Sequence, residues 1–214
     1  MNYVSILDLG ISNIFSIDGL FKNLGYKTKI ISSPQDVAKS KIIVIPGVGS
    51  FPAAMNYLNK KKLINSLKRY AENKNPIIGI CLGMQLLFEK STEFGNNEGL
   101  GILQGEVEAF KNSVIKTHIG WNKVFFNKDN IFYKYLKKEK NDLYRDQYYY
   151  FVHSFYPIPN DQNLILTETK YGSEKFCSSI LNENILALQF HPEKSSKDGI
   201  NLISNFLKFL KNND

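Results

Sequence analysis

The chain has 214 residues, of which 43% are hydrophobic and 13% aromatic, so we expect one folded domain spanning 1–214 and exclude a disordered chain. Its formal net charge is +7, but scattered lysines supply that charge and Arg69 and Arg145 are the only arginines, which argues against a nucleic-acid partner. No apolar run is long enough to cross a bilayer and the two cysteines lie far apart, so we expect a cytoplasmic protein outside the membrane.

Strand-like and helix-like segments alternate through the first half of the chain. The opening "MNYVSILDLG" predicts a strand, because no basic stretch precedes its apolar run as in a signal peptide. Further strands are predicted at 27–32, 41–47 and 75–80, and helices at 13–26, 53–73 and 84–91. This order predicts an α/β fold with a mostly parallel central sheet flanked by helices on both faces.

The second half of the chain changes character. Its text is aromatic and strand-like from Val107 to about Phe155, and strand-like again from 163 to 190. Hairpin-like spacing and polar turns predict antiparallel strands added to the parallel sheet. A lysine-rich stretch at 127–147 is partly helical in pattern, and the chain is predicted to end in a helix at 197–212.

Cys81 stands between Gly79 and Gly83, after a buried strand and before a helical pattern, in "NPIIGICLGMQLLFEK". This is the arrangement of a nucleophile elbow, with sulfur in place of the serine oxygen. The glycines allow strand and helix to pack closely, and the elbow aims the sulfur at the crevice beyond the strands' carboxyl ends. The helix start favours thiolate, and free backbone N–H groups from Leu82 onward can donate to an oxyanion. The alternative is a buried cysteine that serves only packing.

A second stretch, "LQFHPEKS", supplies a base beside such a nucleophile. Pro192 disfavours a helical conformation at His191, so we expect an extended chain through His191, Pro192 and Glu193. In an extended chain the outer two side chains lie on the same side, so His191 can face the cysteine while Glu193 orients the imidazole. That is the nucleophile, base and orienter arrangement of a hydrolytic triad. The alternative is an ordinary turn at a strand end.

Glycines also follow the buried strand "KIIVI", in "IPGVGSF". Gly47 and Gly49 can expose backbone N–H groups in a nest that binds an anion. Beside a nucleophile, this segment is a candidate for the second half of an oxyanion hole, although glycines at strand ends usually only turn the chain.

Five segments in order carry a family resemblance: "PGVG", "GICLGMQLLF", "GWN", "YYFVHS" and "QFHPEKS". Together they resemble the class I glutamine amidotransferases, and most of all the glutaminase subunits of the histidine pathway. The resemblance runs through nearly the whole chain. It implies a glutaminase with a Cys-His-Glu triad, in which Cys81 attacks the side-chain amide of glutamine, His191 moves the proton and Glu193 holds His191. Ammonia leaves from a glutamyl thioester, which water then hydrolyses to glutamate.

The same resemblance implies roles for further residues. Gly49 and Leu82 fall at oxyanion-hole positions, and Gln85, Glu93 and Ser154 fall where the family contacts glutamine. The family's partner interface corresponds to Trp121, Tyr150 and Lys194, for which core aromatics and a solvated lysine are the alternative. The implied partner is a (β/α)-barrel cyclase subunit, joined in a heterodimer, which uses channelled ammonia to make imidazole glycerol phosphate and AICAR.

Two departures from the family pattern leave the acceptor open. The segment 127–147 is longer than the usual connection, and Phe155 stands where the family often has tyrosine. A paralogous subunit that feeds ammonia to a surface-sugar aminating synthase is therefore one alternative. A stand-alone cysteine hydrolase and a non-catalytic binding protein on the same fold are two others.

The remaining histidines and the second cysteine predict no further chemistry. His118 and His153 lie in strand-like text without ligand partners at metal spacing, so we expect no metal site. Cys177 reads as a core residue of a strand, and the chain shows no cofactor motif, so we expect no cofactor.

Overall fold

The computed structural model describes residues 3–10, 13–111, 116–138 and 147–213. Within them, a central sheet of nine strands runs in the order β2-β1-β3-β4-β13-β12-β11-β8-β9. The first five strands in that order pair in parallel and the other four extend the sheet antiparallel, which confirms the predicted fold class. The bounds in that order are Lys27–Ile31, Tyr3–Leu7, Ile43–Ile45, Ile77–Ile80, Ile185–Leu188, Glu174–Asn182, Ile165–Tyr171, His118–Phe126 and Tyr148–His153.

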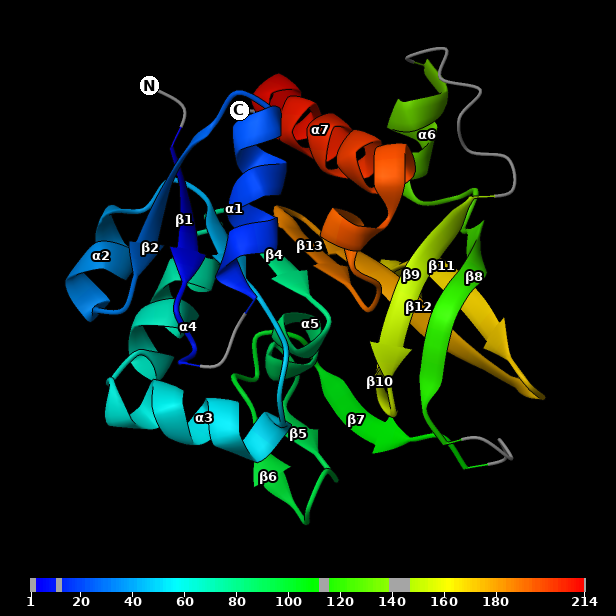
Figure 1. Ribbon diagram of the computed structural model, residues 1–214, viewed down its shortest axis with the longest axis horizontal. Coiled ribbons are helices and arrows are strands. Elements are labelled where there is room, and N and C mark those ends of the chain that lie inside the picture. Colours follow the sequence, from blue (N-terminus) through cyan, green and yellow to red (C-terminus); the bar gives the residue numbers. More distant parts are fainter. Residues whose placement is uncertain (1–2, 11–12, 112–115, 139–146, 214) are drawn as a thin grey trace.

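Helices cover both faces of this sheet, as the alternating pattern predicted (Figure 1). One face packs against α1, α6 and α7, through a core that includes Phe21, Phe132 and Phe206. The other face packs against α2, α3, α4 and α5, through a core that includes Leu58 and Met84. The bounds of α1 to α7 are Ile14–Asn23, Pro34–Lys39, Phe51–Lys60, Ile64–Glu72, Leu82–Leu86, Ile131–Lys138 and Ser196–Asn213.

A small second sheet of four strands lies beside the end of the central sheet at which β4 leads into α5. Its strand order is β10-β7-β5-β6, with bounds Phe155–Pro159, Gly105–Ala109, Lys90–Ser91 and Asn97–Glu98. Strand β9 ends at His153 and β10 begins at Phe155, so the chain passes from the central sheet to the small sheet at the single residue Ser154. This crossing brings the central sheet and the small sheet together next to Cys81.

Three predicted elements differ from the structure. The helix predicted at 53–73 is two helices, α3 and α4, because the chain turns between them at Lys62, whose φ is +57°. The helix α2 was not predicted; Ser33 caps it by accepting from the N–H of Asp36, with proline in the first turn. The helix after Cys81 ends at Leu86 rather than near residue 91, where the chain already forms β5.

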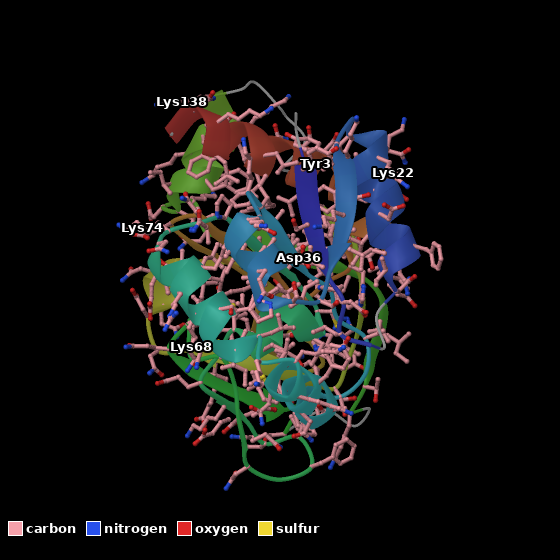
Figure 2. The ribbon with its side chains drawn as sticks, turned by 90° about the vertical axis from the view of Figure 1, so that its left-hand side faces the viewer. Tyr3, Lys22, Asp36, Lys68, Lys74 and Lys138 are labelled. Carbon is pink, nitrogen blue, oxygen red and sulfur yellow. The ribbon has the colours of Figure 1, made fainter. Side chains whose placement is uncertain are left out.

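Lysines on one side of the molecule lie on different parts of the chain. Figure 2 shows Lys22 on α1, Lys68 on α4, Lys74 in the connection between α4 and β4, and Lys138 on α6. Two of them pair with acids, Lys22 with Asp18 at 2.7 Å and Lys74 with Glu183 at 3.0 Å. Among the described residues, no helix is long and apolar enough to cross a membrane. Of the lysine-rich segment 127–147, α6 is described, whereas residues 139–146 lie outside the described ranges.

Candidate active site

Cys81 occupies a sharp turn between β4 and α5. Its φ of +53° and ψ of −109° lie outside the regions that a residue with a side chain ordinarily adopts. The backbone holds this conformation from both sides: the Cys81 N–H donates to the Leu188 carbonyl at 2.6 Å, and the Cys81 carbonyl accepts from Met84 N–H at 3.0 Å. Backbone strain of this kind persists only where the surroundings impose it, and it is common at functional sites.

The glycines around Cys81 are required by close backbone contacts. A Cβ atom on Gly83 would lie 1.9 Å from the Ile45 carbonyl oxygen, and one on Gly79 would lie 3.0 Å from the backbone of Met84. A Cβ atom on Gly47, in the "PGVG" segment, would lie 2.4 Å from the backbone nitrogen of Leu82. These contacts pack the "PGVG" segment directly against the turn that carries Cys81.

His191 and Glu193 meet beside this turn. His191 follows β13, the strand next to β4, and its backbone is extended, with φ −97° and ψ 98°. Its Nδ1 lies 2.7 Å from Glu193 Oε1, and both side chains are 2% exposed. The expectation of an extended chain through Glu193 was wrong, because Pro192–Lys194 forms a 3-10 turn. That turn nevertheless places the two side chains in contact.

The electrostatics of His191 favour its charged form. Burial lowers the pKa of the imidazole, but the nearby Cys81 and Glu193 side chains outweigh this effect and raise the pKa above its ordinary value. Nε2 is buried and makes no hydrogen bond to any described residue. An imidazolium whose Nδ1 is held by a carboxylate, with Nε2 free, favours a thiolate at Cys81 and can pass a proton.

Cys81 and His191 line one cavity of about 310 Å³, a size that suits a small molecule. Its other lining residues are Gly47, Val48, Gly49, Leu82, Gln85, Glu93, Thr117, Val152, His153, Ser154 and Phe155. A hollow of about 210 Å³ lies at the opposite, amino-terminal ends of β4 and β13, where Asn75 and Glu183 line it. The first cavity is the candidate active site, because Cys81 and His191 both line it and it lies at the carboxyl ends of parallel strands.

The three residues expected to contact substrate all line this cavity. Both amide hydrogens of Gln85 are used within the protein, since Nε2 lies 2.8 Å from the Phe155 carbonyl and 3.1 Å from Gln189 Oε1. Glu93 Oε2 accepts from Phe51 N–H at 2.6 Å, at the start of α3. Ser154 Oγ lies 2.9 Å from Thr117 Oγ1. Each therefore keeps only part of its hydrogen-bonding capacity for a ligand.

Gly49 and Leu82, at the positions assigned to an oxyanion hole, also line the cavity. Leu82 is the first residue of α5, so its N–H belongs to a helix start without a carbonyl partner inside that helix. Gly49 has a φ of +106°, a conformation that a side chain would strain.

The three residues assigned to a partner interface form one cluster. Trp121 on β8 and Tyr150 on β9 are opposite each other in the antiparallel pair, with ring centroids 6.3 Å apart. Lys194 Nζ lies 5.7 Å from the centre of the Tyr150 ring. Trp121 is 52% exposed, so the cluster presents aromatic surface to solvent. The backbone of Tyr150 also contacts the segment that carries His191, because its carbonyl accepts from His191 N–H at 2.9 Å.

Two buried side chains of the site were given no role in it from the sequence. Gln189 Nε2 lies 3.6 Å from Cys81 Sγ, and His153 Nδ1 lies 2.8 Å from the Phe155 carbonyl. The signal for Gln189 was available, since it stands two residues before His191 in the same strand-end text. Phe155 takes part through its backbone carbonyl, so the departure from tyrosine leaves these contacts unchanged.

The structure gives no support for a metal site or for chemistry at the second cysteine, Cys177, among the described residues. Among the described residues no cluster of His, Cys, Asp and Glu has the arrangement of a metal site. Cys177 is buried in β12, and burial raises the pKa of its thiol, so it is a poor nucleophile.

The family described as "Glutamine amidotransferase class-I" matches residues 5–209 of this chain. Imidazole glycerol phosphate synthase subunit HisH of Aquifex aeolicus is 42% identical over 202 residues, covering 94% of each chain. The subunit of the same name from Pyrococcus furiosus is 44% identical over 206 residues, covering 96% of this chain and 98% of the relative. Among solved structures, PurLQS from Thermotoga maritima superposes with a TM-score of 0.73 at 17% identity, covering 98% of this chain and 99% of that one.

Proposed function

The chain belongs to the class I glutamine amidotransferases, and we propose that it is the glutaminase subunit of an imidazole glycerol phosphate synthase, in histidine biosynthesis. It hydrolyses glutamine to glutamate and ammonia, and a cyclase partner consumes the ammonia. The observation that carries this proposal is that Cys81, on its strained elbow, and His191, whose ring is held by buried Glu193, line one cavity.

In the first half of the reaction, the Cys81 thiolate attacks the side-chain amide carbon of glutamine. The carbonyl oxygen becomes an oxyanion, and backbone N–H groups at Leu82 and Gly49 are the proposed donors to it. The C–N bond then breaks, and the leaving nitrogen takes the proton from His191 Nε2, so that neutral ammonia and a γ-glutamyl thioester form.

In the second half, water attacks the thioester. Neutral His191 takes a proton from the water through Nε2, which is unoccupied by other described residues. The C–S bond breaks, glutamate leaves, and the thiolate–imidazolium pair is restored. Glu193 holds Nδ1 through both halves, so the ring keeps one orientation while its charge changes.

The remaining hydrogen-bonding capacity of the lining residues fits the amino-acid end of glutamine. Gln85 has only Oε1 left, an acceptor suited to the α-ammonium group. Glu93 keeps one carboxylate oxygen for the same charge, since its other oxygen caps α3. Ser154 can donate its hydroxyl hydrogen to the α-carboxylate.

Ammonia released into bulk water becomes ammonium, which is not a nucleophile, so the product must pass directly to the acceptor. We place the cyclase over the exposed cluster of Trp121, Tyr150 and Lys194, because solvent-exposed aromatic side chains are typical of interface centres. The resulting assembly is a heterodimer with an enclosed ammonia path. The "PGVG" segment is proposed to reorient on partner binding, with Gly49 permitting the change.

One experiment tests the function and its acceptor together. Glutamate release is measured for the chain alone, then with the cyclase subunit, then with its phosphorylated ribulose-type acceptor, with Cys81→Ala as the inactive control. We expect a stepwise rise that the control lacks. A flat response to the cyclase, with a rise on adding a sugar-aminating synthase instead, would move the chain to the alternative pathway.

A further inference from the structure

Gln189 is a fully buried glutamine that touches the reactive sulfur. The register of β4 and β13 pairs Ile80 with Leu188, so the next residues along the two strands, Cys81 and Gln189, come side by side. Gln189 Nε2 lies 3.6 Å from Cys81 Sγ, and Gln189 Oε1 lies 3.1 Å from Gln85 Nε2. A buried carboxamide needs such partners, so its contacts show what the site requires of it.

The orientation of the Gln189 carboxamide follows from its neighbours. The Phe155 carbonyl can only accept, so the end of Gln85 that faces it, at 2.8 Å, must be the NH2 group. The second hydrogen of that NH2 group points to Gln189, whose facing atom must then be oxygen. The other end of Gln189 is therefore its NH2 group, and it is a donor that faces the sulfur.

The Phe155 carbonyl that accepts from Gln85 is also bound by a buried histidine, His153, which in turn contacts a second one, His118. His153 Nδ1 donates to the Phe155 carbonyl at 2.8 Å, which leaves its Nε2 to accept from His118 Nδ1 at 3.1 Å. Burial lowers the pKa of His118 to about 4 and that of His153 to about 3, so both rings are neutral at physiological pH and keep these tautomers. Asn122 Nδ2 completes the chain, 3.1 Å from His118 Nε2.

The sulfur has two polar contacts of opposite kind. The Val152 carbonyl oxygen lies 3.7 Å from Sγ and can only accept, whereas Gln189 Nε2 can only donate. A thiol satisfies Val152 by donating its hydrogen. A thiolate has no hydrogen to donate and meets Val152 unfavourably, so of these two contacts Gln189 is the one that stabilises the charged form, in addition to the His191 imidazolium.

We infer that Gln189 is a further catalytic residue of this glutaminase, whose carboxamide N–H donates to Cys81 Sγ and stabilises the thiolate before glutamine binds. The thiol proton moves to His191 Nε2, and Gln189 stays neutral throughout. This inference rests on the proposed function, because it concerns the nucleophile of that reaction.

The test measures the thiolate without using glutamine. In a Cys177→Ala background, the rate of alkylation of Cys81 by iodoacetamide is followed against pH for the parent, Gln189→Met and Gln189→Glu, with His191 and Glu193 unchanged. Gln189→Met removes the donor without adding charge, and we expect its midpoint to rise by about one pH unit, the tenfold effect of one hydrogen bond. Gln189→Glu adds a negative charge at the same place, so its alkylation midpoint should rise further than that of Gln189→Met.

Activity with the cyclase subunit separates a catalytic role from a structural one. We expect Gln189→Met to lower kcat about tenfold, in line with its thiolate. A purely structural role would act through Gln85 and raise KM for glutamine while the alkylation midpoint stayed in place. An unchanged midpoint in folded Gln189→Met overturns the inference, and Gln189→Leu, which also removes the donor without adding charge, decides it in the same way if Gln189→Met does not fold. If the midpoint rises in Gln189→Met as expected but the parent has no glutaminase activity, the proposed function fails and the inference about Gln189 stands.

Discussion

Glu193 holds His191 Nδ1 at 2.7 Å, while the other ring nitrogen, Nε2, is left without a partner among the described residues. Because Glu193 occupies Nδ1, this contact determines that Nε2 is the ring nitrogen available for the proposed proton transfer. Both side chains are buried, so solvent competes little for the interaction.

Replacing Glu193 by glutamine should therefore slow the chemistry more than it weakens binding. The amide can still hold Nδ1–H but no longer stabilises an imidazolium, so we expect kcat to fall about 100-fold, within the range of general acid–base effects. Glutamate release with the cyclase subunit is the measurement. Glu183→Gln, at the opposite end of β13 and on the surface, is the matched control and should retain activity. Equal kcat in the two variants would remove Glu193 from the mechanism.

The pH dependence of activity should follow the thiolate–imidazolium pair. The raised pKa of His191 keeps the ring protonated above its ordinary range, so activity should persist from neutral into mildly alkaline pH. In acid, protonation of the sulfur removes the nucleophile and kcat/KM should fall. In the pH profile of the residual His191→Asn activity, the fall in acid should be shifted relative to that of the parent. An unshifted fall would show that a group other than His191 causes it.

Stability should fall in acid because His118 and His153 are buried in their neutral forms. Their folded-state pKa values, about 4 and about 3, lie below the unfolded value of 6.5, so the unfolded chain binds more protons between these limits. The free energy of unfolding therefore rises with pH in this window and is lost as pH falls. Each histidine contributes a slope of up to about 1.4 kcal/mol per pH unit.

The variant His118→Phe isolates this effect. It keeps the stacking against Phe151 and Tyr171, whose ring centroids lie 4.7 Å and 4.3 Å from that of His118, but it cannot titrate. We expect it to be less stable at pH 7, because His153 loses a partner, and less sensitive to acid between pH 6.5 and 4. Urea unfolding at several pH values measures both, and parallel curves for variant and parent would contradict the assignment.

The sequence predicted the buried strands of the fold better than the points where helices break or end. Strands such as β3 and β4 are short apolar runs, which read plainly as buried parallel strands. The break between α3 and α4 was missed because Lys62 adopts a positive φ that its residue type does not announce. The helix after Cys81 was predicted to be too long because "LLFEKS" consists largely of residues common in helices. In the structure, pairing with other strands places Lys90 and Ser91 in β5.

The candidate site divides in the same way. Cys81, His191 and Glu193 stand in two motifs typical of a nucleophile and of a base with its orienter, so they could be named before the structure. The short spacing of His191 and Glu193 predicted their contact, whereas their approach to Cys81 depends on the pairing of β4 with β13. Gln189 depends on the register between two strands 108 positions apart, and the His118–His153 contact depends on that between β8 and β9. Such registers are set by packing of the whole sheet, which a single sequence does not reveal.

The elbow glycines give a direct test of the turn geometry. Gly83→Ala would place a Cβ atom 1.9 Å from the Ile45 carbonyl oxygen, a backbone atom that cannot move aside cheaply. We expect a loss of about 3 kcal/mol or more in the free energy of unfolding, measured in urea. Gly19→Ala in α1 is the matched control: no atom lies within 4 Å of its added Cβ, so it should stabilise the chain by up to about 1 kcal/mol. Similar effects at both glycines would refute the close contact.

Binding of the cyclase should depend on the exposed aromatic cluster more than on exposed apolar residues elsewhere. Trp121 packs edge-on against Tyr150, whose backbone carbonyl accepts from the N–H of His191, so a partner that covers this pair also lies close to the segment that carries His191. We expect Trp121→Ala to weaken binding of the cyclase subunit at least about tenfold, as at interface hot spots, and to reduce the activation it gives. Ile30→Ala on β2, an exposed apolar residue at the opposite edge of the central sheet, is the control and should bind normally. Calorimetric titration of each variant with the cyclase gives the comparison, and equal affinities would place the interface on another surface.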